Sequence, residues 1–336
     1  MIYTDYNLQP LLTFNTPCIA RKVIEIQSEK DLDLLTDQML NDRIVILSGG
    51  SNILFEKSVF EGTVLLIRNQ GVRVIKEDSQ SVVIQAQAGQ RWRDFVVDCC
   101  NKGWWGVENL SAIYGNVGAV CVQNIGAYGC EVKDTVLDCT TYNPRTKHWR
   151  TYTNSECDFD YRYSIFKYPK ELEIIWSVRF LLSKQPRINL TYKALYDEVA
   201  RQNINITTPL QVSQLVTHIR DSKLPNPQEF GNCGSFFKNP VISPQEFVKL
   251  KTCIGEENIP AFKTDKGIKL SAAWLIERDG WKGKRVGNVG MHSAQALVMV
   301  NYGGASSEEP VDLSNKIIAS IKSHFGITLQ REVHII

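Results

Sequence analysis

The stretch Ile44-Val45-Ile46-Leu47-Ser48-Gly49-Gly50-Ser51-Asn52 reads as a short buried strand that runs directly into a glycine-rich loop. The loop has neither the Gly-x-Gly-x-x-Gly spacing of dinucleotide-binding motifs nor the lysine of a phosphate-binding P-loop. Successive glycines still allow backbone N–H groups to converge on an anion, and Ser51 and Asn52 add donors. The loop therefore indicates an anion site, and a tight turn without a ligand is the alternative.

A second glycine-rich segment lies further along the chain, from Asn109 to Gly129. It carries four glycines from position 115 onward, with small and apolar residues between them and no charged residue. Ordering so many glycines costs conformational entropy, and a plain surface loop would carry more charge. Backbone that lies against a flat or extended ligand explains the segment best. A pyrophosphate joined to a ring system would suit both loops.

The third informative segment is Gly231-Asn232-Cys233-Gly234-Ser235-Phe236-Phe237-Lys238-Asn239-Pro240. It has too many turn-forming residues for the interior of a strand or helix, and it is too apolar for an ordinary surface loop. We therefore expect backbone held close to a ligand with the Ser235 hydroxyl aimed at it. A Gly-Ser turn that merely reverses the chain is the alternative.

Composition favours a globular protein of two or three domains. The chain has 336 residues, of which 43% are hydrophobic and 22% charged, and its net charge is +2. This balance gives no broad electrostatic case for binding nucleic acid or a membrane surface. The nine cysteines form no Cys-x-x-Cys pair, and the histidines show no ligand spacing, so we expect reduced thiols, a cytoplasmic protein and no metal site. The sequence also shows no signal peptide and no membrane span.

The order of elements predicts an α+β fold, because strands with few helices come first and regular βαβ alternation is absent. Residue periodicity predicts strands at 44–47, 64–67, 82–88, 136–142 and 174–181 and at the terminal 332–336, and helices from 91 to Gly103, around 212–219, from Ser243 and over 313–325. A polar stretch, 190–209, separates the two parts.

Taken together, these segments resemble one enzyme family. The motifs Ser48–Asn52, Glu108–Gly129, Tyr161–Lys167, Gly231–Pro240 and Arg331–Val333 match, in the same order, those of the flavoenzyme family of UDP-N-acetylenolpyruvoylglucosamine reductases. Leu190-Thr191-Tyr192 resembles the longer of the family's two forms.

The resemblance implies a two-part FAD-binding fold of the vanillyl-alcohol-oxidase (PCMH) type with a C-terminal α+β substrate domain. The corresponding division is 1–68 with 327–336, 69–209, and 210–326. It also implies non-covalent FAD, which NADPH reduces and which then reduces the enolpyruvyl ether of a UDP-sugar to UDP-N-acetylmuramate for peptidoglycan. The protein is expected to be a cytoplasmic monomer that binds neither nucleic acid nor membrane.

The resemblance implies three catalytic residues. Arg162 and Glu332 would stabilise the enolate that forms after hydride transfer, and Ser235 would protonate its carbon. Whether Glu332 is protonated stays open. The residues implied for FAD are Ser48, Gly49, Gly50, Ser51, Asn52, Ile113, Gly115, Val117, Gly118, Ala119, Asn124, Gly126 and Ala127. Those implied for the UDP-sugar are Tyr161, Tyr192, Lys223, Asn239 and Gln295.

The chain departs from the family pattern at Tyr114, where proline is usual, and at Cys233, which we expect to make the enzyme sensitive to thiol reagents. Two rival interpretations are a flavin oxidase of the same fold and a non-catalytic protein that binds flavin or a nucleotide sugar. Arg162, Ser235 and Glu332 argue against both rivals, because all three reacting positions are kept.

Overall fold

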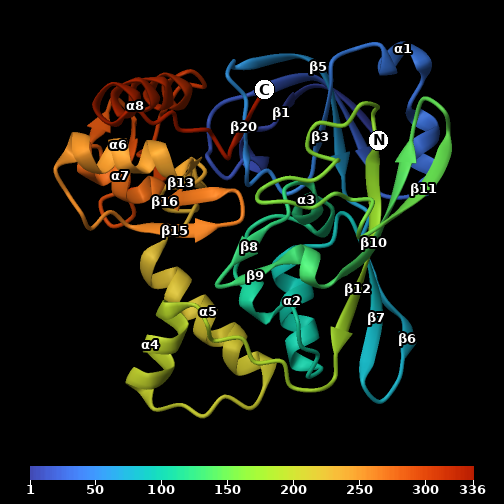
Figure 1. The fold of residues 1–336 in the computed structure, drawn as a ribbon. Coiled ribbons are helices and arrows are strands. Elements are labelled where there is room, and N and C mark those ends of the chain that lie inside the picture. The colour runs from blue at the N-terminus through green and yellow to red at the C-terminus, as the bar shows by residue number, and fades with distance from the viewer. The chain divides into compact units, whose positions relative to one another are not determined.

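The computed structural model describes all of residues 1–336, which form two compact units (Figure 1). Unit 1 comprises residues 1–6, 20–50 and 61–222, and unit 2 comprises 7–19, 51–60 and 223–336. The chain therefore passes between the units several times. The finer three-part division given above stays a prediction. No helix of the chain combines the length and apolarity that spanning a bilayer would need.

The first sheet of unit 1 has the strand order β1-β2-β5-β3. β3 pairs in parallel with β5, from Ile44 opposite Thr63 to Leu47 opposite Leu66. This confirms the predicted strand that precedes Ser48. The strands are β1 (Ile2–Asn7), β2 (Ile19–Ile26), β3 (Ile44–Leu47) and β5 (Val59–Ile67), with η2 (Glu29–Leu34) and α1 (Asp37–Leu40) between β2 and β3. The short helix η1 (Gln9–Leu11), between β1 and β2, belongs to unit 2.

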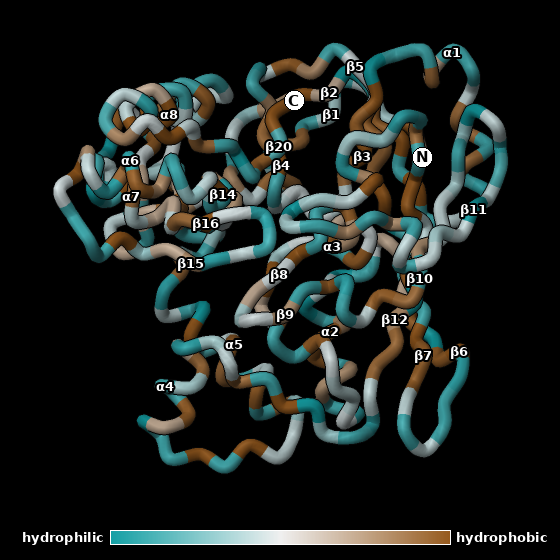
Figure 2. Tube along the Cα trace, viewed as in Figure 1, coloured by the Kyte–Doolittle hydropathy of each residue, from teal (hydrophilic) through white to brown (hydrophobic).

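The second sheet of unit 1 is antiparallel, with the order β11-β10-β12-β7-β6. Its strands are β6 (Val72–Glu77), β7 (Ser81–Gln87), β10 (Val136–Asn143), β11 (His148–Thr153) and β12 (Ile174–Ser183). Figure 2 shows hydrophobic residues along β7 and β12. Helix α2 (Trp92–Asn101) buries the predicted apolar face against this core, and the rings of Phe95 and Phe180 lie 4.8 Å apart.

Between α2 and β10 the glycine-rich segment folds into short elements: η3 (Glu108–Leu110), α3 (Val117–Val122), β8 (Gly126–Ala127), β9 (Cys130–Glu131) and η4 (Val132–Asp134). Unit 1 ends with α4 (Lys193–Gln202) and α5 (Pro209–Lys223). The polar stretch 190–209 was expected to be a simple separator, and α4 corrects this. Its one buried residue, Leu195, packs with Val212 and Val216 of α5, so a single apolar contact anchors an otherwise polar helix.

Unit 2 contains a sheet of order β13-β19-β18-β17 and a smaller one of order β14-β16-β15. The elements are β4 (Ile53–Leu54), β13 (Gly231–Ser235), β14 (Val241–Ile242), α6 (Pro244–Ile254), β15 (Ala261–Thr264), β16 (Gly267–Leu270), α7 (Ala272–Arg278), β17 (Arg285–Val286), β18 (Val289–Met291), β19 (Val298–Asn301), α8 (Glu309–Phe325) and β20 (His334–Ile335). The predicted helix ends are confirmed: the Ser243 side chain accepts from the Glu246 N–H, and Gly326 ends α8 with φ +69°.

Two predictions for unit 2 were wrong. The terminal strand covers only His334–Ile335, which pair in parallel with β4, so Glu332 lies before it. Gly231–Ser235 is a strand despite its turn-forming residues. Two features account for the glycines of this strand. The pairing with β19 shifts between Asn232 and Ser235, where Gly234 has φ +67°. At Gly231 an added Cβ would lie 2.3 Å from the Phe14 carbonyl oxygen.

Candidate active site

In unit 1 the two glycine-rich segments contact each other. A Cβ added at Gly49 would lie 2.6 Å from the Gly115 Cα, so only glycine allows this approach. The neighbouring Ser48 hydroxyl is buried and has no hydrogen-bond partner within the protein. A buried polar atom without a partner costs free energy, so this hydroxyl indicates a missing ligand atom. Ser48, Gly49, Gly50 and Gly115 are thus brought together as expected.

The start of α3 is held by protein contacts. The Val117 N–H donates to the Gln90 carbonyl oxygen (2.9 Å) and the Gly118 N–H donates to that of Ala88 (2.9 Å). A Cβ on Gly118 would lie 2.7 Å from the Ala88 Cβ, so packing explains this glycine. The N–H groups of these two residues are therefore occupied, and any contact that they make with a ligand would use other atoms.

Several predicted cofactor residues shape the segment after α3. Asn124 is fully buried, and its Nδ2 donates to the Glu131 carboxylate (2.9 Å) and to the Asp160 carbonyl oxygen (3.0 Å). Gly126 and Ala127 form β8, which pairs with β9. Ala119 lies within α3, and Ile113 packs against the core of unit 1. Asn124 thus ties the glycine-rich segment to the turn that carries Arg162.

Arg162 is held against this same segment. Its Nη2 donates to the Gly126 carbonyl oxygen (3.1 Å), and its guanidinium carbon lies 5.4 Å from the centre of the Tyr161 ring. Its backbone has φ +54°, a left-handed conformation that costs free energy for any residue with a Cβ. Strained residues of this kind concentrate at functional sites. The structure therefore joins two motifs that lie about 36 residues apart in the sequence.

Tyr192 precedes α4 and is 49% exposed. Its ring meets that of Tyr128 edge to face, with centroids 5.2 Å apart. The second predicted substrate tyrosine is thereby anchored on the glycine-rich segment.

In unit 2 the structure brings Ser235 and Glu332 to neighbouring positions. Ser235 ends β13 opposite Val298 of β19, and it is partly exposed. The Glu332 N–H donates to the carbonyl oxygen of Phe236, the residue after Ser235 (2.9 Å). Glu332 is 9% exposed, and its own carbonyl oxygen accepts from the Asn52 side chain (3.2 Å). Asn52 and Ser51 belong to unit 2, whereas Ser48, Gly49 and Gly50 belong to unit 1.

The other predicted substrate residues of unit 2 occupy separate elements. Asn239 follows β13, and its Oδ1 accepts from the Ala272 N–H at the start of α7 (2.9 Å). Gln295 lies in the turn between β18 and β19, where its carbonyl oxygen accepts from the Val298 N–H (3.1 Å). Lys223, the last residue of α5, is exposed, and unit 2 resumes at this residue. Val298 therefore connects Gln295 with Ser235.

Cys233 is buried, and burial raises the pKa of its thiol to about 12. Its Sγ donates to the Ile53 carbonyl oxygen (3.8 Å). Since the thiolate is the reactive form, this burial argues against the expectation that Cys233 confers sensitivity to thiol reagents, and labelling of the native protein tests it.

Two residues of unit 1 escaped the sequence analysis. The Arg220 Nε is buried without a hydrogen-bond partner, and so is the Asn109 Oδ1, although the Asn109 Nδ2 donates to the carbonyl oxygens of Tyr128 and Asn189 (2.9 and 3.0 Å). The spacing Arg220-x-x-Lys223 was the available signal, since residues three apart share a helix face.

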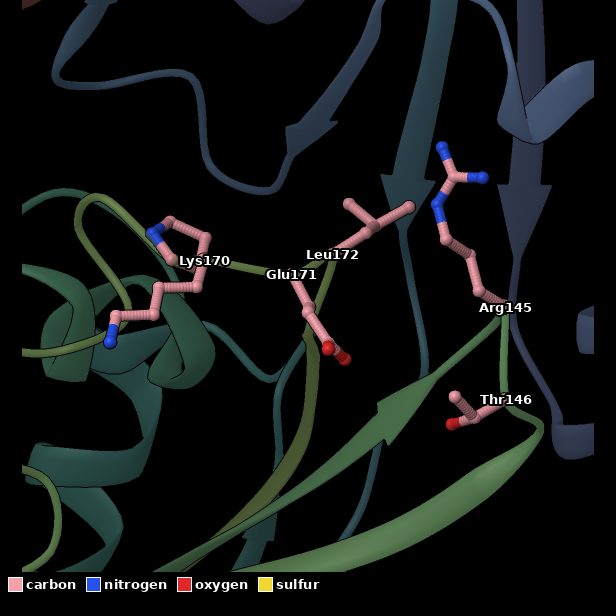
Figure 3. A pocket seen from close by; sticks show the side chains of 6 residues that line it. Arg145, Thr146, Lys170, Glu171 and Leu172 are labelled. Atoms are coloured by element: carbon pink, nitrogen blue, oxygen red, sulfur yellow. The ribbon is translucent and has the colours of Figure 1, made fainter.

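A surface hollow of about 510 Å³ also opens on unit 1, but none of the predicted site residues lines it (Figure 3). Arg145, Lys170 and Glu171 supply its charges. The Glu171 carboxylate already accepts from Asn143 (2.7 Å), and Arg145 donates to the Leu40 carbonyl oxygen. Glu171 and Arg145 therefore have partners within the protein.

Comparison with known proteins shows which family the chain is similar to. An FAD-binding-domain profile matches residues 20–152, and a profile for the C-terminal domain of UDP-N-acetylenolpyruvoylglucosamine reductase matches 226–336. Reductases of that name from Flavobacterium johnsoniae and Bdellovibrio bacteriovorus are 40% and 39% identical to the chain. These alignments cover 100% and 98% of the chain and 99% and 98% of the relatives.

The fold also matches a solved structure. The reductase of the same name from Thermus caldophilus has a TM-score of 0.68 at 19% identity, over 100% of this chain and 98% of that one. The predicted α+β fold with a flavin-binding part and a C-terminal part is confirmed. The chain belongs to the family of UDP-N-acetylenolpyruvoylglucosamine reductases.

Proposed function

We propose that this chain reduces the enolpyruvyl ether of UDP-N-acetylglucosamine-enolpyruvate to UDP-N-acetylmuramate, with FAD and NADPH, during the synthesis of peptidoglycan precursors. The observation that carries the proposal is its identity of about 40% to reductases of this name over the full length of both chains. The retention of Arg162, Ser235 and Glu332 supports catalysis over binding alone.

The residues of unit 1 fit FAD. Gly49 and Gly115 bring the two loops together more closely than any residue with a Cβ would allow, and the Ser48 hydroxyl lacks a partner that a ligand oxygen would supply. Bound FAD would supply the hydride that NADPH has delivered to it. Ser48, Gly49, Gly50, Gly115, Gly126 and Ala127 are the residues that we expect to hold it most directly.

Ser235 and Glu332 would act on the reacting carbon of the substrate. The Ser235 Oγ gives its proton to the carbon that becomes electron-rich, a step for which a positioned acid contributes roughly 10²- to 10⁴-fold. Glu332 is fixed beside Ser235 through the bond from its N–H to Phe236. Its low exposure favours a role at the substrate over that of a solvent-facing strand residue.

Arg162 would bind the substrate carboxylate. A guanidinium stays charged and matches a carboxylate with two parallel N–H donors. The bond from its Nη2 to Gly126 fixes the plane of the guanidinium, so the side chain is oriented before substrate arrives. Tyr161, Tyr192, Lys223, Asn239 and Gln295 would contact the UDP-sugar.

We also propose that the enzyme is a cytoplasmic monomer. All nine cysteines are free thiols, which is usual in a reducing compartment. Light scattering of the purified protein tests the monomeric state.

Anaerobic spectroscopy of the purified wild-type protein tests the function. We expect a yellow protein whose flavin absorbance bleaches with NADPH and returns when UDP-N-acetylglucosamine-enolpyruvate is added without oxygen. Recovery of the absorbance only on admission of oxygen would favour the oxidase alternative. A protein that cannot take up FAD would contradict the proposal.

A further inference from the structure

Two asparagines fasten the segment that leads into α4 to the glycine-rich segment. Asn109 is 1% exposed, and its Nδ2 donates to the carbonyl oxygens of Tyr128 (2.9 Å) and Asn189 (3.0 Å). The Asn189 Nδ2 in turn donates to the Gly129 carbonyl oxygen (3.3 Å) and to the Cys130 Sγ (3.3 Å). We call these hydrogen bonds of Asn109 and Asn189 the asparagine clip.

The oxygen of the Asn189 side chain directs the backbone towards Tyr192. The Asn189 Oδ1 accepts from the Thr191 N–H (3.1 Å) and from the Thr191 hydroxyl (2.7 Å), a turn that asparagine favours. Tyr192 follows as the N-cap of α4, and its side chain makes no capping hydrogen bond. Because serine, threonine, aspartate and asparagine are the usual N-caps, the tyrosine does not serve the helix, and its position needs another reason.

The clip also holds a strained turn in the glycine-rich segment. Tyr128 and Gly129 are the central residues of the turn between β8 and β9, with φ +48° and +80°. The left-handed conformation is unfavourable for a tyrosine, and the hydrogen bond from Asn109 to the Tyr128 carbonyl oxygen helps to hold it. The Tyr128 ring meets the Tyr192 ring edge to face. The clip therefore fixes the backbone on both sides of this ring pair.

We propose that Asn189 is a positioning residue for the substrate, and that through the clip it holds the Tyr192 ring in the orientation that contacts the UDP-sugar. The inference rests on the proposed function, which assigns Tyr192 to the UDP-sugar. Tyr192 is 49% exposed, and an exposed ring on a loose loop would lose conformational freedom when substrate binds. The clip removes part of this cost beforehand, so it acts on the affinity for substrate.

Substitutions of Asn189 test the clip through the Kd of UDP-N-acetylglucosamine-enolpyruvate for the oxidised holoenzyme, measured from the perturbed flavin absorbance. Asn189→Ala removes the side-chain hydrogen bonds, and the Kd should rise about 3- to 10-fold. Asn189→Asp keeps an acceptor for Thr191 but cannot donate to Gly129, so it should raise the Kd as much. A wild-type Kd in either variant would overturn the inference.

A double-mutant cycle shows whether Asn189 acts through Tyr192. Tyr192→Ala should itself raise the Kd of the substrate, and the addition of Asn189→Ala should raise it no further, because the ring that Asn189 positions is then gone. Two fully additive effects would show that Asn189 acts independently of Tyr192 and would overturn the inference. An unchanged Kd in Tyr192→Ala would overturn it as well.

Asn154→Ala is the matched control. The Asn154 Nδ2 likewise donates to two carbonyl oxygens of unit 1, those of Lys133 (2.8 Å) and Val136 (2.7 Å). We expect Asn154→Ala to lower the unfolding temperature, as Asn189→Ala does, but to leave the Kd of the substrate unchanged. An equal rise of this Kd in the control would indicate general loosening of unit 1 and would overturn the inference.

The Kd of FAD for the apoprotein separates the substrate from the cofactor. It should keep its wild-type value in Asn189→Ala, because β8, which is expected to contact FAD, remains paired with β9. A raised Kd of FAD would assign the clip to the cofactor segment and overturn the inference. If instead the wild-type holoenzyme binds no UDP-N-acetylglucosamine-enolpyruvate, the proposed function fails, and the inference fails with it.

Discussion

At the scale of single residues, burial decides which cysteines can react. Cys233 follows Asn232 in β13 and is buried with a raised pKa, whereas Cys253 in α6 is exposed. Cys130 is partly buried, and burial raises its pKa to about 11. The remaining thiols are buried. The location of Cys233 two residues before Ser235 in the sequence did not indicate that its thiol is buried.

We therefore expect one thiol of the native protein to react with iodoacetamide at neutral pH. Mass spectrometry should find the label on Cys253, and Cys253→Ser should abolish labelling. Full denaturation should expose all nine thiols and serves as the control. Rapid labelling of Cys233 in the native protein would show that the strand β13 opens, contrary to its burial.

At the scale of elements, the contact between two glycine-rich segments is the feature that prepares the flavin site. Gly49→Ala would place a Cβ 2.6 Å from the Gly115 Cα, so the two loops must separate. We expect at least a roughly 10-fold rise in the Kd of FAD, since a separation of even a few tenths of an ångström weakens charge-assisted bonds to a ligand. Fluorescence titration of the apoprotein measures it.

Gly103→Ala is the matched control for this substitution. Gly103 has φ +75°, so alanine costs about 1–2 kcal/mol in backbone strain, but the added Cβ meets no atom within 4 Å. It should lower stability without changing the Kd of FAD. An unchanged Kd in Gly49→Ala would show that the close approach is not needed for the cofactor.

Elements with local signals were predicted from the sequence, and elements that depend on tertiary contacts were not. The apolar period of α2 and the cap at Ser243 specify helices from nearby residues alone. β13 was missed because its glycines are required by the Phe14 carbonyl and by a bulge, neither visible locally. Helix α4 was missed because Leu195 alone gives it an apolar face.

The same distinction applies to the site. Ordered motifs identified Ser235, Arg162 and Glu332 through resemblance, and their roles stay predictions. Arg220 escaped notice because its lack of a partner depends on how α5 packs against Tyr128. No pattern in one sequence reports an unpaired charge.

At the scale of the whole molecule, the proposed catalytic residues come from both units. Arg162 belongs to unit 1, and Ser235 and Glu332 belong to unit 2. Unit 1 contains most of the residues that are expected to bind FAD. We therefore expect substitutions of Ser235 in unit 2 to affect substrate reduction but not flavin reduction, because flavin reduction needs the cofactor site and substrate reduction also needs the Ser235 proton.

Stopped-flow measurement of the two half-reactions in Ser235→Ala tests this account most directly. Ser243→Ala, which removes a helix cap in the same unit, is the control and should leave both rates unchanged. The account predicts that Ser235→Ala keeps FAD and is reduced by NADPH at the wild-type rate, while its reoxidation by UDP-N-acetylglucosamine-enolpyruvate slows roughly 10²- to 10⁴-fold. Reoxidation at the wild-type rate would contradict it.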